Sequence, residues 1–478
     1  MNEKLEQFKR KIAGKKIAVI GLGIEGIALI EFLSDFDVEL AVLDQQNEKS
    51  LMKKADTYQQ EELAKIFQDN TIKKYLGDGY LNDLAEFDII FRSPSFYFDH
   101  PQLVEAKKNG AEISTQIKLF MDLCPCKIIG VTGTKGKGTT ASLIFEILNS
   151  AFKAQNSEIT SKVYLAGNIG YPVMNLLPEI GMNDIVILEL SNFQLADLHS
   201  SPHIAVVTNL GVDHLDYHNS VEEYHQAKES ILRYQTSEDY AVLNRNSTFD
   251  EDFLATVKSR KLYFSKDHKN SDAYVGEADG ENAAFVKGAL LCKESEVKLM
   301  GRFNLENIAA AALASSLSGA DFSTMKKAVT NFIPLEFRIE FVVEIDGVKY
   351  INDSFATNPG PTIAAIESFK EPKILILGGS KKGADFSEMA KVITKNNVIA
   401  VVLIGLEGPV IGQALAEAGY GGKVVKGEDT MEKIVMQTKN IALSGNAVIF
   451  SPACASFDMF KDYKDRGRKF TEEVNKLR

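Results

Sequence analysis

The sequence has few of the residues that mark disulfide-rich, repetitive or membrane-spanning proteins. Four cysteines among 478 residues are too few for the disulfide framework of a secreted protein. The 34 glycines and 12 prolines exclude collagen-like and low-complexity chains. No apolar run reaches the roughly 18 residues of a membrane span, and the N-terminal segment is charged rather than apolar. These absences predict a reduced, cytoplasmic, globular protein with no membrane span.

Positive charge is also in short supply. The 54 lysines and arginines are outnumbered by 65 aspartates and glutamates, which gives a net charge of −11. A protein that binds nucleic acid regardless of sequence needs a basic face, so the composition disfavours nucleic acid as a partner. Apolar residues make up 45% and charged residues 25%, as in soluble globular proteins. The length predicts roughly three domains, each able to bury its own core.

Short apolar runs alternate with helical patterns in three segments, and this alternation predicts α/β domains with parallel sheets. We expect domain bounds of 1–122, 123–334 and 335–478. The expected strands are 16–20, 40–43, 87–91, 128–132, 184–188, 204–207, 240–243, 373–377, 399–404 and 447–450. The expected helices are 27–33, 101–109, 139–148, 221–234 and 305–317, with short strands and polar turns over 250–300 and a hairpin over 341–351. Ligands gather at the carboxyl ends of such strands, where most of the motifs below lie.

The strongest local pattern is the glycine-rich run from Gly130 to Thr140, which reads GVTGTKGKGTT. It follows an expected strand and precedes an expected helix, so its backbone N–H groups and the helix N-terminus can hold phosphates. Lys137 can reach the β- and γ-phosphates of a nucleotide. Gly138 stands where a hydroxyl residue usually follows the lysine, so Thr139 supplies the hydroxyl for Mg²⁺. The alternative is a glycine-rich turn without a ligand.

A second glycine pattern, Gly21-x-Gly23-x-x-Gly26, follows the first expected strand, and Asp44 lies 23 residues after Gly21. This spacing is close to that of a dinucleotide-binding fold. On the local pattern alone, NAD binding, a close-packed turn and a site for another diphosphate all remain open.

Two further polar segments follow expected strands. Glu189 begins the segment 189–194, and a carboxylate at a strand end beside a phosphate loop can hold Mg²⁺. His214 lies in the segment 208–216 and is a candidate metal ligand, although a single histidine is more often packed or solvated. Lys228 lies on an expected helix, where the alternative is a solvated charge.

These motifs, in this order, resemble the Mur ligase superfamily of ATP-dependent amino-acid ligases over nearly the whole chain. The resemblance is strongest to the MurD branch. The motifs that carry it are 133–137, 166–170, 189–195, Asp213-His214, Ala227-Lys228, Gly301-x-x-Asn304-x-x-Asn307, 338–340, 352–354, 378–379, 384–386 and 451–456. The resemblance implies an N-terminal Rossmann-like domain for a UDP-linked substrate, a central ATP-binding domain and a C-terminal Rossmann-like domain for an amino acid. The first glycine motif then holds a sugar-nucleotide diphosphate rather than NAD.

The resemblance also assigns roles to individual residues. It implies a UDP-substrate site at Gly23, Ile24, Glu25, Asp44, Gln45, Ser93, Asn168, Ser191 and Gln194. It implies an ATP site at Gly133, Thr134, Lys135, Gly136, Lys137, Gly138, Thr139, Thr140, Asn304, Asn307, Arg338 and Asp353. It implies two Mg²⁺ ions held by Thr139, Glu189, His214 and a CO₂-derived carbamate on Lys228, with Lys137, Glu189, His214, Lys228, Arg338 and Asp353 as the catalytic set. It implies an amino-acid site at Thr357, Lys382, Ser456, Phe457 and Tyr463.

The implied reaction joins D-glutamate to UDP-N-acetylmuramoyl-L-alanine through an acyl phosphate, as a step of peptidoglycan precursor synthesis by a monomeric enzyme. Phe355 departs from the superfamily, which usually has a lysine there. A Mur-type ligase that uses another amino acid, such as L-glutamate, or a folylpolyglutamate synthase-like enzyme, therefore remains the alternative.

Overall fold

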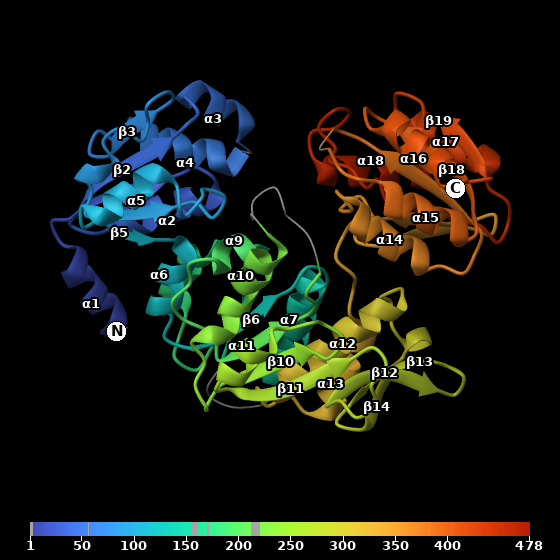
Figure 1. Ribbon diagram of the computed structural model, residues 1–478, viewed down its shortest axis with the longest axis horizontal. Coiled ribbons are helices and arrows are strands. Elements are labelled where there is room, and N and C mark those ends of the chain that lie inside the picture. The colour runs from blue at the N-terminus through green and yellow to red at the C-terminus, as the bar shows by residue number, and fades with distance from the viewer. Residues whose placement is uncertain (1–2, 56, 155–160, 170–171, 212–219, 382) are drawn as a thin grey trace. The chain divides into compact units, whose positions relative to one another are not determined.

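The protein is described here from a computed structural model that covers residues 3–55, 57–154, 161–169, 172–211, 220–381 and 383–478 (Figure 1). Its contacts divide the chain into two compact units. The first comprises residues 1–276, 284–291 and 306–329, and the second comprises 277–283, 292–305 and 330–478. Three sheets follow one another along the chain.

The first sheet has five parallel strands in the order β3-β2-β1-β4-β5, the strand order of a Rossmann-type fold. Alternate residues of each strand pack into two different cores, because side chains point to opposite faces of a sheet. Ile17 and Val19 enter one core, and Ala18 and Ile20 enter the other. The strands are β1 (Lys16–Ile20), β2 (Glu39–Asp44), β3 (Lys73–Leu76), β4 (Ile89–Arg92) and β5 (Glu112–Ser114).

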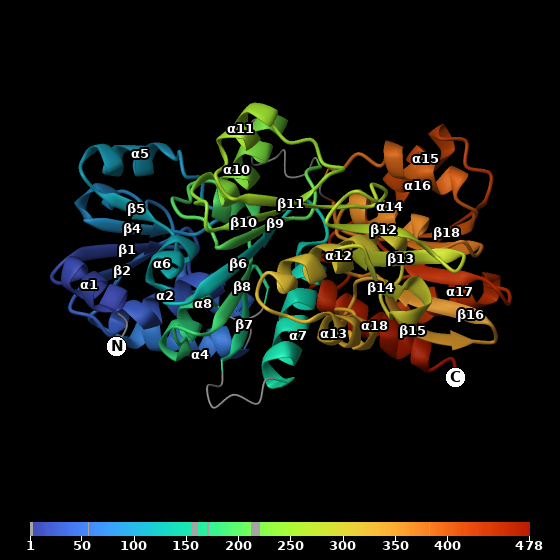
Figure 2. The ribbon, with the colours of Figure 1, turned by 90° about the horizontal axis from the view of Figure 1, so that it is seen from below.

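The second sheet has nine strands in the order β14-β13-β12-β11-β10-β9-β6-β8-β7. Within this order, every neighbouring pair in the run β12-β11-β10-β9-β6-β8-β7 is parallel. Figure 2 shows the long helix α7 beside β6, β8 and β7, against which it packs. The strands are β6 (Lys127–Thr132), β7 (Val163–Gly167), β8 (Ile185–Glu189), β9 (Ile204–Val207), β10 (Tyr240–Asn244), β11 (Arg260–Ser265), β12 (Ala273–Ala278), β13 (Glu281–Val286) and β14 (Ala289–Lys293).

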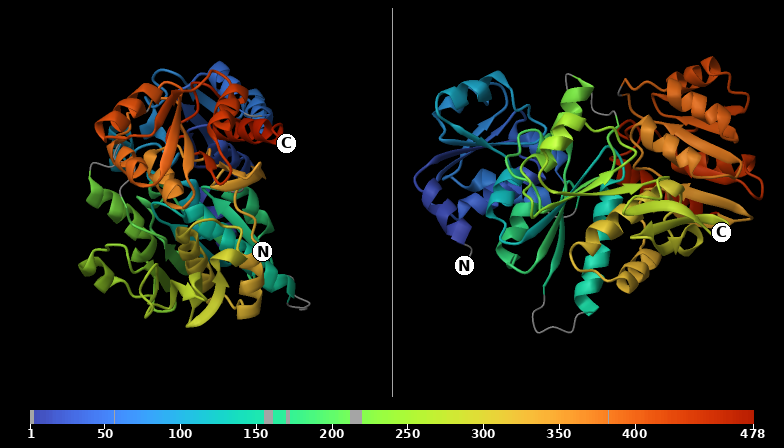
Figure 3. Two further views of the ribbon diagram at one scale, coloured as in Figure 1. Left: turned by 90° about the vertical axis from the view of Figure 1, so that its right-hand side faces the viewer. Right: turned by 60° about the horizontal axis from the view of Figure 1, so that its bottom comes forward.

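The third sheet has six strands in the order β15-β16-β20-β17-β18-β19, and only the β15–β16 hairpin is antiparallel. Helices cover both of its faces (Figure 3), so Leu375 and Leu377 pack into one core while Ile374 and Ile376 pack into the other. The strands are β15 (Glu340–Ile345), β16 (Val348–Asn352), β17 (Lys373–Gly378), β18 (Val398–Ile404), β19 (Lys423–Lys426) and β20 (Ala447–Phe450).

The helices connect and flank these strands, and none of them in the described part of the chain is long and apolar enough to cross a membrane. They are α1 (Glu3–Ile12), α2 (Ile24–Ser34), α3 (Glu48–Lys54), α4 (Thr57–Gln68), α5 (Pro101–Lys108), α6 (Gln116–Leu123), α7 (Lys137–Ala154), α8 (Val173–Leu176), α9 (Asn192–Leu195), α10 (Val221–Arg233), α11 (Glu251–Thr256), α12 (Arg302–Ser316), α13 (Phe322–Asn331), α14 (Pro359–Glu367), α15 (Ser387–Lys395), α16 (Gly408–Glu417), α17 (Met431–Ile441) and α18 (Tyr463–Asn475), with short 3₁₀ turns at Leu84–Glu86, Leu177–Glu179 and Glu294–Glu296.

The expected α/β class is confirmed, and three local expectations were wrong. Helix α7 begins at Lys137 rather than Thr139, because the Thr140 N–H already donates to Gly136 O at 2.9 Å and closes the first turn. Residues 250–300 include the helix α11 as well as strands, because Asp250 caps the N–H of Phe253. Helix α12 begins at Arg302 rather than Leu305, so Asn304 lies inside its first turn.

Candidate functional site

The phosphate loop lies between β6 and α7, at the carboxyl edge of the second sheet. Gly133 has φ +146°, and a side chain there would collide with Thr208 and the backbone of Asn209. Only glycine combines this conformation with so close an approach. The glycines of the motif are therefore required by the packing of the loop as well as by its exposed N–H groups.

Asn209, which follows β9, holds the loop in shape. Its Oδ1 accepts hydrogen bonds from the N–H groups of Thr134 and Lys135 at 2.9 Å, and its Nδ2 donates to Lys135 O at 3.1 Å. Thr208 Oγ1 also donates to Lys135 O. The sequence placed Asn209 in a polar segment but gave it no role. Its position directly after a strand, at the same sheet edge as the phosphate loop, is the signal that could have found it.

Lys137 is the first residue of α7, and its ammonium group folds back over the loop. Its Nζ donates to Gly133 O at 2.8 Å and to Thr134 O at 3.2 Å. The Thr134 side chain is itself fixed, because its Oγ1 accepts from the Gly211 N–H at 2.9 Å and from the Tyr224 hydroxyl at 3.2 Å. The loop thus places a cation at the N-terminus of an 18-residue helix, where an anion is stabilised.

Glu189 ends β8 beside this loop, since its backbone is in register with Val131 of β6. The side chain is 2% exposed, and Oε1 accepts from Asn168 Nδ2 at 2.9 Å. Oε2 is buried and has no hydrogen-bond partner among the described residues. A buried carboxylate oxygen without a partner is costly, and a cation that binds it removes the cost. This oxygen therefore fits a divalent metal ion.

Lys228 lies on α10 and is 1% exposed, which excludes the alternative of a solvated charge. Its Nζ lies 4.3 Å from the centre of the Tyr224 ring, within reach of a cation–π interaction. His214, the other candidate ligand of a second ion, lies outside the described residues. The part of the chain that the structure describes contains no cluster of three or more metal-ligating side chains.

The two asparagines predicted for ATP lie in different surroundings. Asn307 lies against the phosphate loop, because a side chain at Gly136 would collide with its Oδ1, and it lies 3.4 Å from Thr140 Oγ1. Asn304 Nδ2 donates to Met300 O at 2.7 Å. Thr139 is half-buried on α7.

The first glycine motif lies at the carboxyl edge of the first sheet, where the strand order reverses between β1 and β4. A side chain at Gly26 would collide with Gly21 O, and one at Gly21 would press on Ser93 Cβ at 2.9 Å. Asp44 is buried, and its two oxygens accept the N–H groups of Leu22 and Gln46 at 2.9 and 2.8 Å. Close packing therefore accounts for Gly21, Gly26 and Asp44, while Gly23, Ile24 and Gln45 are exposed at this edge.

Glu25 points toward the central part of the first unit. Its Oε1 accepts from Gln194 Nε2 at 2.9 Å, and Gln194 Oε1 in turn accepts from the Ser191 N–H at 3.0 Å. Burial raises the pKa of Glu25, and the Gln194 hydrogen bond only partly opposes it. Three predicted substrate residues thus have hydrogen-bond partners within the protein. Asn168 donates to Glu189, Ser191 caps α9, and Gln194 donates to Glu25.

Arg92, at the end of β4, is buried and forms an ion pair with the partly exposed Asp197, which the sequence did not reveal. Its Nη2 lies 2.6 Å and its Nε 3.2 Å from the two carboxylate oxygens of Asp197. Its Nη1 donates to the carbonyl oxygens of Ser93, Pro94 and Phe96. The pair joins the edge of the first sheet to the segment that follows α9.

We expect Arg92→Met to lower the free energy of unfolding by about 2–3 kcal/mol, because it removes the charged hydrogen bonds of a buried guanidinium and leaves the partly exposed Asp197 without its partner. Arg92→Lys keeps the charge but loses the bidentate contact with the carboxylate, so its free energy of unfolding should lie between those of the natural protein and Arg92→Met. Urea unfolding of the three proteins tests this, and a loss below about 1 kcal/mol for Arg92→Met would contradict it.

In the second unit, Asp353 follows β16 and is 4% exposed. Its Oδ1 accepts from the Ile339 N–H at 3.1 Å, and its Oδ2 accepts from Ser451 Oγ at 2.6 Å. Burial raises the pKa of Asp353 to about 7, although these two hydrogen bonds and the charges of Arg338 and Arg466 oppose the rise. The carboxyl group therefore titrates near neutral pH.

This pKa predicts a pH dependence of stability. Because folding raises the pKa, folding favours the protonated acid, and that contribution is present below about pH 4 and is lost as the pH rises through about 7. Asp353→Asn stays neutral, so its stability relative to the natural protein should increase between pH 5 and pH 8, by at most about 1.4 kcal/mol per unit. Unfolding free energies at both pH values check this, and parallel pH profiles would contradict it.

Two predicted residues of the second unit, Arg338 and Tyr463, pack against Phe355. The guanidinium carbon of Arg338 lies 3.8 Å from the centre of the Phe355 ring, and the Tyr463 ring meets that ring edge-on at 5.1 Å. Phe355, which stands where the superfamily usually has a lysine, is thus an aromatic residue packed against two predicted site residues. Thr357 is half-buried, Ser456 is 2% and Phe457 71% exposed, and Lys382 lies outside the described residues.

Comparison with known proteins agrees with these features. Three family models match in succession: "Mur ligase MurD-like, N-terminal domain" over residues 15–115, "Mur ligase middle domain" over 131–315 and "Mur ligase, glutamate ligase domain" over 337–454. Solved structures share the fold at low identity. One is MurC of Thermotoga maritima (20% identity, TM-score 0.58, 97% of this chain and 100% of that chain), and another is MurF of Acinetobacter baumannii (15%, 0.59, 81% and 91%).

The fold and the phosphate loop thus define an ATP-dependent ligase of the Mur class. Curated relatives narrow the class further: UDP-N-acetylmuramoylalanine–D-glutamate ligases of Acetivibrio thermocellus and Clostridium novyi are 39% and 38% identical, each over the full length of both chains. The chain belongs to the Mur ligase family, in its MurD branch.

Proposed function

We propose that this chain joins D-glutamate to UDP-N-acetylmuramoyl-L-alanine at the expense of ATP, as a step of peptidoglycan precursor synthesis. The observation that carries the proposal is identity of 39% over the full length to a D-glutamate ligase, combined with an intact phosphate loop next to a buried carboxylate. Residues 1–122 would bind the UDP end of the substrate, 123–334 ATP, and 335–478 glutamate.

The chemistry sets requirements that the described residues of the first unit meet. The alanyl carboxylate must approach the γ-phosphate of ATP to form an acyl phosphate, and the two groups repel each other. Lys137 and the N-terminus of α7 neutralise phosphate charge at the loop. The glutamate amine then attacks the acyl carbon, and phosphate leaves as the amide forms.

The donor set of this site suits Mg²⁺, which prefers oxygen ligands. The Glu189 carboxylate, with its buried Oε2, and the Thr139 hydroxyl would hold one ion, and His214 with a carbamate on Lys228 would hold a second. Bound Mg²⁺ supplies additional positive charge to the phosphate oxygens. The burial of Lys228 supports its assignment, because a lysine in a ligand site must leave solvent.

The assignments in the other sites are also proposals. The exposed edge at Gly23, Ile24 and Gln45, with Ser93 beside it, is available to the UDP end of the substrate. Arg338 and Asp353 would act on ATP or the acyl group, and Thr357, Lys382, Ser456, Phe457 and Tyr463 would contact glutamate.

An amino-acid panel tests the proposal. With ATP, Mg²⁺ and UDP-N-acetylmuramoyl-L-alanine, we expect phosphate release with D-glutamate and little with L-glutamate or other amino acids. Faster turnover with L-glutamate would identify the protein as a variant Mur ligase. Turnover only with a folate acceptor would identify it as a folylpolyglutamate synthase-like enzyme. No turnover with either glutamate enantiomer would reject the proposal.

A further inference from the structure

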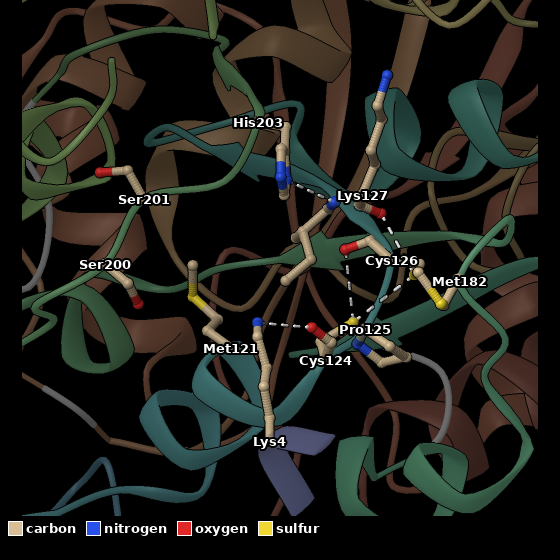
Figure 4. A pocket seen from close by; sticks show the side chains of 11 residues that line it. Lys4, Met121, Cys124, Pro125, Cys126, Lys127, Met182, Ser200, Ser201 and His203 are labelled. Carbon is tan, nitrogen blue, oxygen red and sulfur yellow. Dashed lines mark hydrogen bonds between the residues drawn. The ribbon is translucent and has the colours of Figure 1, made fainter. Parts of the chain in front are cut away.

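A pair of cysteines connects the first and second sheets. Cys124-Pro125-Cys126 is the whole link between α6, which ends at Leu123, and β6, which begins at Lys127. Cys124 has φ −59° and ψ +124°, so it does not continue the helix, and the link through Pro125 brings the two side chains together. Figure 4 shows both sulfur atoms on one wall of a pocket. The predicted ligase chemistry uses neither thiol.

The two sulfur atoms are already close together. Cys124 Sγ lies 3.6 Å from Cys126 Sγ, whereas a disulfide requires about 2.05 Å. Both residues are thiols in the structure. A movement of about 1.5 Å therefore separates the pair from a covalent bond. A disulfide between residues only two apart closes a very small ring, and strained disulfides of this kind are readily reduced again.

The two thiols differ in acidity. The hydrogen bond between the two thiols lowers the pKa of Cys124, with a smaller contribution from the charge of Lys4, while burial and the Asp184 carboxylate oppose the fall. The same hydrogen bond and burial raise the pKa of Cys126. Lys4 Nζ donates to Cys124 O at 3.1 Å and so places a positive charge beside Cys124. A nearby cation favours the thiolate, so Cys124 is the better nucleophile and Cys126 is the resolving thiol.

Both cysteines line a pocket, although they are themselves only 3% and 6% exposed. It has a volume of about 210 Å³ and is lined on its polar side by Lys4, Lys127 and His203, with no carboxylate among its described lining residues. His203 Nδ1 accepts the N–H of Ile128 at 3.1 Å, so the neutral ring carries its proton on Nε2. The lining thus favours an anionic reagent over a cationic one.

We propose that Cys124 and Cys126 form a thiol–disulfide exchange site for small anionic disulfides, with Cys124 attacking and Cys126 resolving. The Cys124 thiolate attacks one sulfur of the disulfide RSSR, forms a mixed disulfide and releases RS⁻. The Cys126 thiol then loses its proton and attacks Cys124 Sγ, which releases the second RS⁻ and closes the Cys124–Cys126 bond. Two electrons pass from the pair to RSSR, and the two thiol protons leave with two RSH.

Glutathione disulfide is the probe for the test. The full-length protein is incubated with it, quenched at timed intervals by an alkylating reagent, and mapped by mass spectrometry. We expect a peptide that contains both cysteines to lose two hydrogens and both alkylation sites, and dithiothreitol to restore them. Cys126→Ser should stop at a stable glutathione adduct on Cys124, and Cys124→Ser should react about tenfold more slowly than the natural protein.

Cys454→Ser is the matched control. Cys454 is also buried, but burial raises its pKa to about 12, so this variant should cross-link the pair at the natural rate. The wild-type mapping needs no variant to fold. Absence of the cross-link in the natural protein, separate glutathione adducts on both cysteines, or equal rates in Cys124→Ser and Cys126→Ser would each overturn the proposal.

Discussion

Lys137→Ala is expected to lower kcat for phosphate release by at least about 10²–10³-fold, the usual effect of removing one preorganised group that neutralises developing charge. In the structure, Nζ bonds the carbonyl oxygens of Gly133 and Thr134, so it already lies over the loop before any nucleotide binds. The position of the charge therefore costs no reorganisation during the reaction. Lys137→Arg should also be impaired, because a planar guanidinium cannot take the place of the compact ammonium.

The control for this variant lies on the same helix. Lys153 is exposed in the last turn of α7, so Lys153→Ala removes an equal charge at the wrong end of the helix and should leave kcat unchanged. Urea unfolding shows whether Lys137→Ala has lost more than the roughly 1.5–3 kcal/mol of its charged hydrogen bonds. A folded Lys137→Ala protein with turnover within a few-fold of the natural one would remove Lys137 from the catalytic set.

Glu189→Gln should separate activity from stability. The substitution keeps an oxygen that can accept from Asn168 Nδ2 and removes a buried charge whose Oε2 has no partner among the described residues. In the absence of metal we expect the free energy of unfolding to rise by about 1–2 kcal/mol, since a neutral amide is less costly to bury than a carboxylate. Turnover with Mg²⁺ and ATP should fall by about 10²-fold or more.

Two measurements check this pair of effects. Urea unfolding in the presence of a chelator reports the stability, and phosphate release against Mg²⁺ concentration reports the metal requirement. Glu179→Gln, at an exposed glutamate of the same unit, is the matched control and should change neither. Loss of stability in the chelator together with a natural Mg²⁺ response would show that Glu189 is a structural residue.

The strands and the phosphate loop could be predicted from local patterns in the sequence. The strand at 204–207 and the strand at 447–450 were predicted with the bounds that the structure has, because a buried strand is an apolar run between turn residues. The phosphate loop was also recognisable, since glycines must occupy left-handed or crowded backbone positions such as that of Gly133. The family followed from the order of such motifs.

Side-chain partners were much harder to predict. The pattern at Gly21 and Gly26 fits several ligands equally well, and the structure shows that close packing alone requires these glycines. Glu25 and Gln194 were both predicted for the UDP-substrate site, but the hydrogen bond between them, across 169 positions of sequence, was not. For Lys228 the sequence left a solvated charge open as the alternative to a metal ligand, because the pattern of one helix does not show what packs against its polar face. The structure shows that Lys228 is buried.

The sequence by itself determined the α/β class, the phosphate loop and the family, because these depend on backbone conformation and burial that neighbouring residues encode. Only the tertiary structure decided that Asn209 braces a loop 75 residues away, that Arg92 pairs with Asp197 across 105 residues, and that one carboxylate oxygen of Glu189 is buried without a hydrogen-bond partner among the described residues. These arrangements depend on which strand ends meet at one sheet edge, and no local pattern records that.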